Sequence, residues 1–311
     1  MSASPSDVGH DRRRDNIVRG ILLTLGGIFL FATQDAAQKF LVQSYSPFQI
    51  TMMRFWASFA FSFAIMVRQG EIRGAFRSGS PILQVLRPIF LVVDIWLFSF
   101  ALQTISLAEL QAILLIYPLI VTLVAIPLLK EKVGIFRMVA VCVGFLGALV
   151  IVRPGGVPFD FGVFCAIGAA VTYALYIVLT RKVSETDSTA TSMFYVGVIG
   201  LIMTSAVGIF FWQPPDAASW ALILYIMVTG CVSHAMIIAA LGMAPASVLQ
   251  PFNYTSLPWG ILLGYVLFGQ MIDPISLMGA IVIIAAGLVV MARERIKKIR
   301  PVTNPPLPGK D

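Results

Sequence analysis

The chain has 311 residues, of which 58% are hydrophobic and only 12% are charged, and its formal net charge at pH 7 is +7. Soluble domains carry roughly 25% charged residues. This composition, with a mean hydropathy of +0.89, therefore excludes an ordinary soluble protein and indicates a membrane protein.

Histidine and cysteine are too scarce and too scattered to suggest metal chemistry. The chain has 2 His and 3 Cys, and Cys142, Cys165 and Cys231 all fall within apolar runs. Cysteines in such runs pack as small hydrophobic side chains, and no disulfide framework follows from them. We expect no metal site and no cofactor.

Apolar runs long enough to cross a bilayer recur along the whole chain. A membrane core needs about 20 mainly apolar residues per helix. The sequence predicts ten such helices, near residues 19–41, 48–68, 82–102, 106–129, 135–153, 161–182, 190–212, 218–241, 246–268 and 274–293. The predicted fold class is therefore an all-α membrane protein with ten transmembrane helices. The polar segments 1–18 and 294–311 are expected to be tails on either side of this bundle.

The basic residues predict how the helices are oriented. Most of the 22 Lys and Arg residues lie in the two tails and in the second, fourth and sixth connections, which alternate along the chain. Cytoplasmic segments are enriched in Lys and Arg. Both termini are therefore expected to be cytoplasmic, which requires an even number of helices. The basic excess marks topology, and we expect no nucleic-acid partner.

Two segments repeat a proline-centred pattern. Residues 110–131 (LQAILLIYPLIVTLVAIPLLKE) and 249–270 (LQPFNYTSLPWGILLGYVLFGQ) both begin with Leu-Gln and carry a central proline, Pro118 or Pro258. Proline removes a backbone donor and disturbs the preceding helical turn. Pro118 and Pro258 are therefore predicted hinges for two gates.

A second repeat lies in the opening helix of each half. Residues 20–32 align with residues 162–174, and the register continues to Lys39 against Arg181. The chain thus divides into two five-helix repeats, 19–153 and 161–293, joined by a linker at 154–160. Because five is odd, the second repeat enters the membrane from the opposite side. Inverted repeats build transporters whose substrate site lies near the midplane between the halves.

These features together resemble the EamA-type transporters of the drug/metabolite transporter superfamily. The resemblance rests on the glycine-rich opening helices, the proline-centred fourth helix ending near Lys130-Glu131, and the glycines of each fifth helix, and it covers about residues 19–293. It implies a transporter, and within the family it points to the exporters of amino acids, including aromatic ones.

Ionisable residues inside membrane helices are the first candidates for a site, because burying them in lipid is unfavourable without a partner or a wet cavity. Asp35 and Arg54 are predicted to lie at similar depth, where they form either a structural ion pair or part of the cargo site. Asp94, near the middle of the third helix, is the carboxylate most expected to be functional. Arg87 is expected to share its face or to extend to the cytoplasmic surface.

Polar and aromatic residues complete the predicted cavity. They lie on the opening and proline-containing helices, or in the apolar run around His234, and their alternative role is hydrogen bonding between helices. The predicted substrate-binding residues are Gln34, Asp35, Asp94, Tyr117, Tyr173, Tyr176, His234, Asn253 and Tyr254. His234 either senses pH or packs as a hydrogen-bonded core residue.

The sequence therefore predicts a multi-pass transporter of the inner membrane that rocks one half against the other and exports small organic metabolites, most specifically amino acids. Drug-like cations, nucleosides, sugars and a receptor without transport are the alternatives. No nucleotide-binding loop and no catalytic constellation are present, so neither direct use of ATP nor enzymatic activity is expected. The expected partners are a small-molecule substrate and the lipid bilayer. Proton coupling and oligomeric state are left open.

Overall fold

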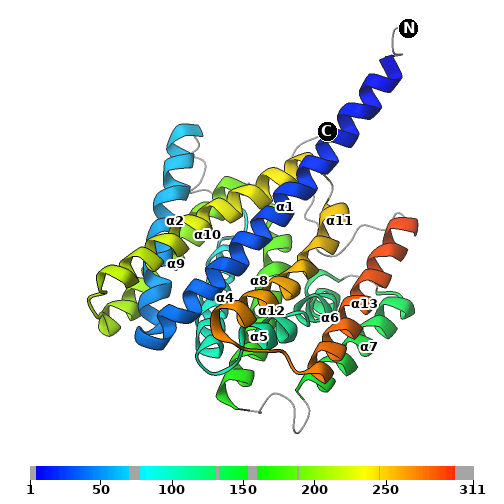
Figure 1. The fold of residues 1–311 in the computed structure, drawn as a ribbon. Coiled ribbons are helices and arrows are strands. Elements are labelled where there is room, and N and C mark those ends of the chain that lie inside the picture. Colours follow the sequence, from blue (N-terminus) through cyan, green and yellow to red (C-terminus); the bar gives the residue numbers. More distant parts are fainter. Residues whose placement is uncertain are drawn as a thin grey trace.

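The computed structural model describes the backbone of residues 5–69, 78–130, 133–152, 160–187, 189–244 and 246–297, and within these ranges it contains only helices and their connections (Figure 1). The first half contains α1 (Pro5–Ser44), α2 (Pro47–Gln69), α4 (Pro81–Thr104), α5 (Leu107–Leu114), α6 (Tyr117–Leu129) and α7 (Ile135–Ile151). The second half contains α8 (Phe161–Val183), α9 (Thr189–Gly208), η1 (Ile209–Phe211), α10 (Ala217–Met243), α11 (Ala246–Leu249), η2 (Gln250–Thr255), α12 (Ser256–Phe268) and α13 (Pro274–Lys297).

Local sequence explains where several helices begin. Proline is the first residue of α2, α4 and α13, a position where its missing N–H is not needed. Asp160 caps α8 by accepting hydrogen bonds from the amides of Gly162 and Val163. Ser106 and Glu109 form a reciprocal capping box at the start of α5, which satisfies two otherwise unpaired groups.

The described helices confirm a multi-pass membrane protein, but they do not confirm a count of ten spanning helices. Eight segments are long and apolar enough to span a bilayer, and Met138–Ile151 within α7 is a shorter apolar helix. The helix predicted over 246–268 is instead divided among α11, η2 and α12. Pro251 and Pro258 each remove a backbone donor there, and the Thr255 hydroxyl donates to the Phe252 carbonyl at 2.6 Å.

The proline-centred helix of the first half is also interrupted. Helix α5 ends at Leu114 and α6 begins at Tyr117, with a turn at 115–116 between them. The Ile116 amide bonds to the Ile113 carbonyl at 3.1 Å, which is the tighter spacing of a 3₁₀ turn. The irregularity thus directly precedes Pro118, where a proline disturbs a helix.

Helices α1 and α13 extend into the segments predicted to be tails, while their apolar spans, Asn16–Ser44 and Pro274–Arg293, lie close to those predicted. Helix α1 begins at Pro5 rather than near residue 19, and α13 continues to Lys297 rather than ending near 293. Adding further residues to an existing helix costs little free energy. The change from apolar to polar composition therefore does not end the helix. The linker predicted at 154–160, the C-terminal residues 298–311 and Glu131 lie wholly or largely outside the described residues.

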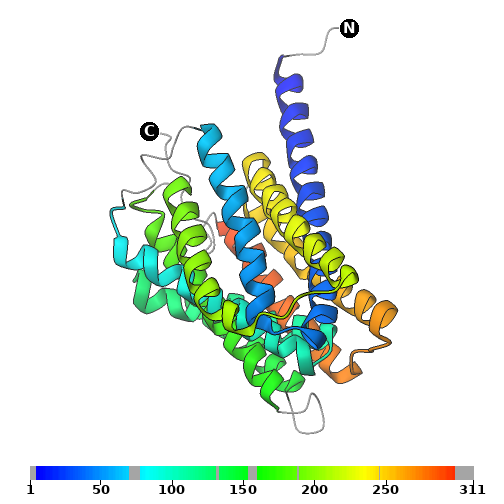
Figure 2. The same cartoon turned by 90° about the vertical axis from the view of Figure 1, so that its left-hand side faces the viewer.

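The helices of the two halves interlock. Helix α1 packs along α10, α4 along α8, α2 along α9, and α7 along α13 (Figures 1 and 2). Each pair joins one helix from the first half to one from the second. At the α7–α13 crossing, a Cβ on Gly147 would lie 2.7 Å from the Gly279 carbonyl oxygen, and a Cβ on Gly279 would lie 2.6 Å from that of Gly147. Only glycine allows this backbone approach.

Candidate functional site

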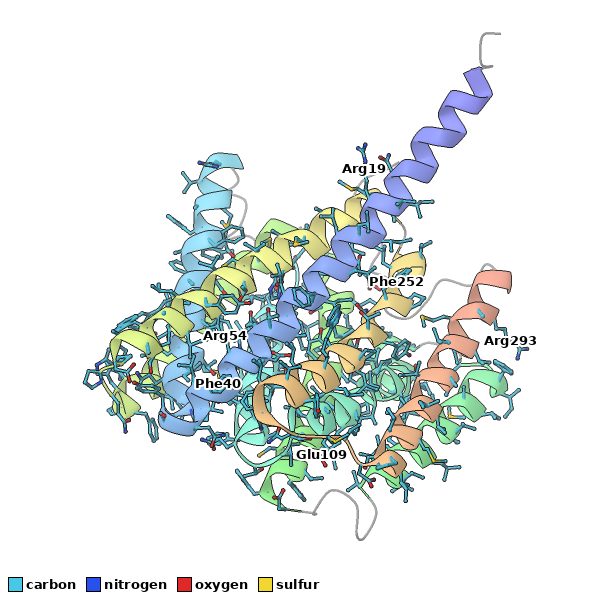
Figure 3. All side chains as sticks on the ribbon, viewed as in Figure 1. Arg19, Phe40, Arg54, Glu109, Phe252 and Arg293 are labelled. Carbon is cyan, nitrogen blue, oxygen red and sulfur yellow. The ribbon has the colours of Figure 1, made fainter. Side chains whose placement is uncertain are left out.

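Three charged residues from three helices meet within the bundle. Asp35 of α1, Arg54 of α2 and Asp94 of α4 are all half-buried, and Arg54 interacts electrostatically with both carboxylates. Figure 3 shows Arg54 among the helices of the bundle and Glu109 nearer one end. The predicted proximity of Asp35 and Arg54 is thus present, but Asp94 shares the same arginine.

Arg54 and Asp35 each form a hydrogen bond with a glutamine side chain of a neighbouring helix rather than with each other. Arg54 Nη1 donates to Gln38 Oε1 at 2.5 Å, and Gln111 Nε2 donates to Asp35 Oδ2 at 3.0 Å. Gln38 Nε2 in turn donates to Ser99 Oγ at 2.6 Å. A chain of polar contacts therefore fixes α2 to α1 and α1 to α4.

Ser99 had no signal in the sequence that would single it out, because serine is common in apolar helices and its partner Gln38 is distant in the chain. Gln38 does have a local signal, because it lies three residues after Asp35 and so on the same face of α1. Both side chains are fully buried. Buried amides and hydroxyls need partners, and these two satisfy one another.

Four tyrosines extend the site from the carboxylates. The rings of Tyr117 (α6) and Tyr173 (α8) lie 5.0 Å apart in an edge-to-face arrangement, and those of Tyr173 and Tyr176 are stacked 6.1 Å apart. Tyr254 of η2 lies near Tyr117, and Tyr173 lies near Asp94. We call Asp35, Arg54, Asp94, Tyr117, Tyr173, Tyr176 and Tyr254 the central cluster.

The central cluster brings polar atoms and aromatic rings together inside the bundle. The Asp94 carboxylate and the four tyrosines are half-buried, and the Tyr254 hydroxyl lies against Gly287 of α13. Polar groups that converge among aromatic side chains are typical of a ligand site.

The remaining predicted residues are Gln34, His234 and Asn253, of which His234 interacts electrostatically with Arg54 and Asn253 is adjacent to Tyr254. Gln34 is 1% exposed and lies against Gly230 of α10, with its Oε1 unpaired. His234 is exposed; its Nδ1 lies 2.8 Å from the Gly230 carbonyl, and its ring meets Phe31 edge-on at 4.9 Å. Asn253 is half-buried in η2. Gln34 therefore lies in the interface between α1 and α10 and is not a member of the central cluster.

Pro118 and Pro258 both lie just inside the second part of an interrupted segment. Pro118 is in the first turn of α6, and Pro258 is the third residue of α12. Each follows the irregular backbone at 115–116 or at Gln250–Thr255. The geometry is compatible with bending there, and the hinge role is still a prediction.

Arg87 is held in a buried hydrogen-bond network rather than extending to the membrane surface, and its guanidinium lies 5.7 Å from the ring centroid of Tyr176 in the central cluster. Arg87 is 2% exposed, and its guanidinium donates to the Ser192 carbonyl at 2.7 Å, to Gln84 Oε1 at 3.1 Å and to Thr180 Oγ1 at 3.3 Å. Gln84 also donates to Asp187 Oδ2 at 2.8 Å. Burial alone would raise the pKa of Asp187, but hydrogen bonds from Ser78, Gln84, Gly79 and Thr186 outweigh it and lower that pKa.

Among the residues whose positions are described, no group of three His, Cys, Asp or Glu side chains is arranged to hold a metal ion. A helical membrane bundle with a charged and aromatic cluster on helices of both halves is typical of a membrane carrier. The sequence matches the EamA-like transporter family over residues 18–153 and 160–292, so the chain belongs to that family. It is a transporter of small metabolites and not an enzyme.

Curated relatives carry the names of metabolite transporters. The chain is 22% identical over 278 residues to an S-adenosylmethionine uptake transporter of Rickettsia prowazekii (strain Madrid E), covering 89% of this chain and 94% of that protein. It is 30% identical over 193 residues to a riboflavin transporter of Vibrio cholerae serotype O1, covering 62% of this chain and 64% of that protein. A solved crystal structure shares the fold with a TM-score of 0.62 at 18% identity, covering 90% of this chain and 98% of the other.

Proposed function

We propose that this protein is an alternating-access transporter of the inner membrane that carries small organic metabolites through the space beside the central cluster. The observation that carries the proposal is the placement of Asp94 beside Arg54 and Tyr173, inside the bundle and among tyrosines from both halves. Charged groups inside a membrane protein are costly and usually mark a transport path.

The two halves of the proposed transporter are the inverted repeats 19–153 and 161–293, joined at 154–160. Equivalent pairings support this division, because the first helix of each repeat packs against the third helix of the other, as α1 with α10 and as α8 with α4. This interlocking argues against rocking of intact five-helix halves. The moving bodies are instead mixed pairs, α1 with α10 and α4 with α8.

The helix interruptions before Pro118 and Pro258 support bending of these two segments as a second motion in the transport mechanism. Segments that bend at 115–116 and at Gln250–Thr255 change the access to the cluster without separating those helix pairs. Both termini lie in the cytoplasm in this proposal, following the distribution of Lys and Arg. One proline is then near the gate on each side of the membrane.

The cargo is a metabolite that contains a ring, with amino acids as the second candidate. Relatives are named for S-adenosylmethionine and riboflavin, whose fused ring systems suit a site with four tyrosines. Amino-acid export, expected from the sequence, lacks support from those names. Aromatic amino acids still share the ring that the tyrosines favour.

Transport by purified protein in liposomes tests this function. Radiolabelled S-adenosylmethionine, riboflavin and phenylalanine are offered separately, and we expect saturable movement of at least one ring-containing compound above that in empty vesicles. Asp94→Asn should lower this movement, whereas Glu109→Gln, which retains a capping side chain at the end of the bundle, should not. Absence of movement across this panel and a broader metabolite mixture would refute the proposal.

A further inference from the structure

We infer that Lys39 is a latch that holds the bundle closed at one end, and that the structure is the state sealed at that end and released at the other. The sealed end, where α1 and α4 end, is called the distal end. Figure 3 shows Phe40 and Glu109 towards it and Arg19 towards the opposite, tail end. This inference rests on the proposed transport function and specifies how one side of the protein is closed. With both termini in the cytoplasm, the distal end faces outwards.

The internal repeat makes the helix pairs α1–α10 and α8–α4 equivalent to one another. In each pair, two glycines of the opening helix lie against the same two positions of the third helix, once Ala101-Leu102 is aligned with Ala240-Leu241. The contacts in this common register are Gly20 with Ala244, Gly26 with Met236, Gly162 with Ile105, and Gly168 with Leu97. Because the two pairs match, a contact that is made at one end and missing at the other reports the conformational state.

Packing between these two pairs and their neighbours differs between the two ends. At the distal end, α1 packs against α4, and α5 packs against α12. Under the repeat, the matching combinations at the tail end are α8 with α10, and α11 and η2 with α6. Within the described residues, the helices of these tail-end combinations are not packed together. The structure is therefore sealed at the distal end and released at the tail end.

Lys39 connects the two helix pairs at the sealed end. Its side chain is 4% exposed, and its ammonium donates to the carbonyls of Leu102 at 2.9 Å and Ile105 at 2.6 Å, where α4 ends. Carbonyls at the end of a helix lack helical partners and carry the negative end of the helix dipole. Gln103 Nε2 adds a hydrogen bond to the Val42 carbonyl of α1 at 2.8 Å. A buried positive charge thus fixes the end of α1 to the end of α4.

The same ammonium also reaches the end of α12. It lies 5.7 Å from the ring centroid of Phe268, the last residue of α12. The ring of Phe40, next to Lys39 on α1, lies 4.5 Å from the Phe268 ring. A cation over an aromatic face is attracted to it, and the attraction is stronger where water is excluded. One lysine therefore holds α1, α4 and α12 together.

The contact between α5 and α12 continues this seal towards the central cluster. Gly260 of α12 lies against Gln111 of α5, and Gly264 lies against Leu107. Small residues permit such close helix packing. Gln111 also donates to Asp35 of the cluster at 3.0 Å. A cargo at the cluster can therefore leave through the distal end only after α12 moves away from α5, and this movement requires Lys39 to release its partners.

Distances between spin labels in the purified full chain, reconstituted in lipid nanodiscs, test the assigned state. The three natural cysteines are first replaced by alanine. One label pair, at Ser44 and Phe161, reports the distal end, and another, at Glu185 and Met243, reports the tail end; all four side chains are exposed. We expect the main distance of each pair to match the structure. A main population with a longer distal distance and a shorter tail-end distance would overturn the assigned state, and this measurement leaves the latch unchanged.

Variants then test the latch itself. Lys39→Met removes the charge and keeps an unbranched side chain. Loss of hydrogen bonds from a charged donor should raise the population with a longer distal distance by about 10-fold or more and should shorten the tail-end distance. Lys39→Arg keeps a charged donor and should restore most of the wild-type distribution. Unchanged distal distances in Lys39→Met, with an unchanged gel-filtration profile, would reject the latch.

Two further variants control for charge and for folding. Lys182 is an exposed lysine at the tail end whose ammonium donates to one carbonyl, that of Leu128, at 3.2 Å. Lys182→Met should leave the distal distance unchanged, and a shift equal to that of Lys39→Met would show a general effect of charge. Phe268→Leu removes only the ring and should shift the distal distance in the same direction by less. Absence of any shift in folded Phe268→Leu, if Lys39→Met does not fold, would overturn the inference.

The latch and the transport function fail in distinguishable ways. If vesicles move a metabolite and folded Lys39→Met keeps the wild-type distances, the latch is wrong and the transporter stands. If Lys39→Met opens the distal end but no compound crosses the vesicle membrane, the latch stands and the proposed function fails.

Discussion

The carboxylate of Asp187 accepts a 2.6 Å hydrogen bond from the backbone amide of Gly79, so the connection after α8 holds the connection before α4. Ser78 Oγ and Gln84 Nε2 donate to the same carboxylate at 2.5 Å and 2.8 Å. Asp187 is only 8% exposed. Because these connections come from different repeats, Asp187 ties the two halves at one end of the bundle.

Replacing Asp187 with alanine should destabilise the protein. Three donors would lose one charged acceptor, and we expect a loss of about 2 to 4 kcal/mol, since hydrogen bonds to charged groups contribute about 1.5 to 3 kcal/mol each and are not additive. Thermal unfolding in detergent measures the change. Glu185→Ala, an exposed position in the same connection, is the matched control. Equal melting temperatures for the two variants would show that the Asp187 contacts contribute little.

The same carboxylate predicts a defined dependence of stability on pH. Its hydrogen bonds lower the pKa of Asp187 below the ordinary value of 3.8. The folded state therefore favours the ionised form, and this contribution is complete above the unfolded pKa and is lost as pH falls through the folded pKa. The stability difference between wild type and Asp187→Asn should be constant from pH 5 to 8 and should shrink below about pH 4. Melting curves across this range measure it, and a difference that grows on acidification would reverse the assigned sign.

The contact between Gly147 and Gly279 predicts intolerance of any side chain at the α7–α13 crossing. A Cβ at either position would approach the opposite carbonyl within 2.7 Å. We expect Gly147→Ala to lower stability by about 1 to 3 kcal/mol, which is typical of overpacking. Gly134→Ala, at the start of the same helix, has no atom within 4 Å of the added Cβ and should be tolerated. Chemical denaturation measures the free energy of unfolding of both variants. Equal stability of Gly147→Ala and Gly134→Ala would show that α7 and α13 do not approach closely at this crossing.

Pro118→Ala tests the hinge in the first repeat. Alanine restores a backbone donor beside the turn at 115–116, so α5 and α6 should join more continuously and transport should change by about severalfold in rate. Stability and membrane insertion should change less. Pro127→Ala, an exposed proline later in α6, is the control for a general proline effect. Initial transport rates in vesicles measure both, and unchanged rates in Pro118→Ala would reduce Pro118 to a packing residue.

The amino-acid sequence by itself determined the family and the positions of most helices. Apolar runs of bilayer length are a local property, since a spanning helix satisfies its own backbone and needs only apolar side chains towards lipid. The observed ends at Pro81–Thr104 and Phe161–Val183 lie close to those predicted. The sequence did not identify the substrate, because the repeated motifs determine helix packing and bending rather than contacts with a cargo.

The tertiary structure decided which of the polar residues act together. Gln34 and Asp35 are adjacent in sequence, yet Gln34 packs against Gly230 while Asp35 shares Arg54 with Asp94. Neighbouring helical residues point about 100° apart, and the partner on each side depends on the packing of helices distant in the chain. Gln38 hydrogen-bonds to Arg54 and Gln111 to Asp35, and no local pattern encodes these long-range contacts.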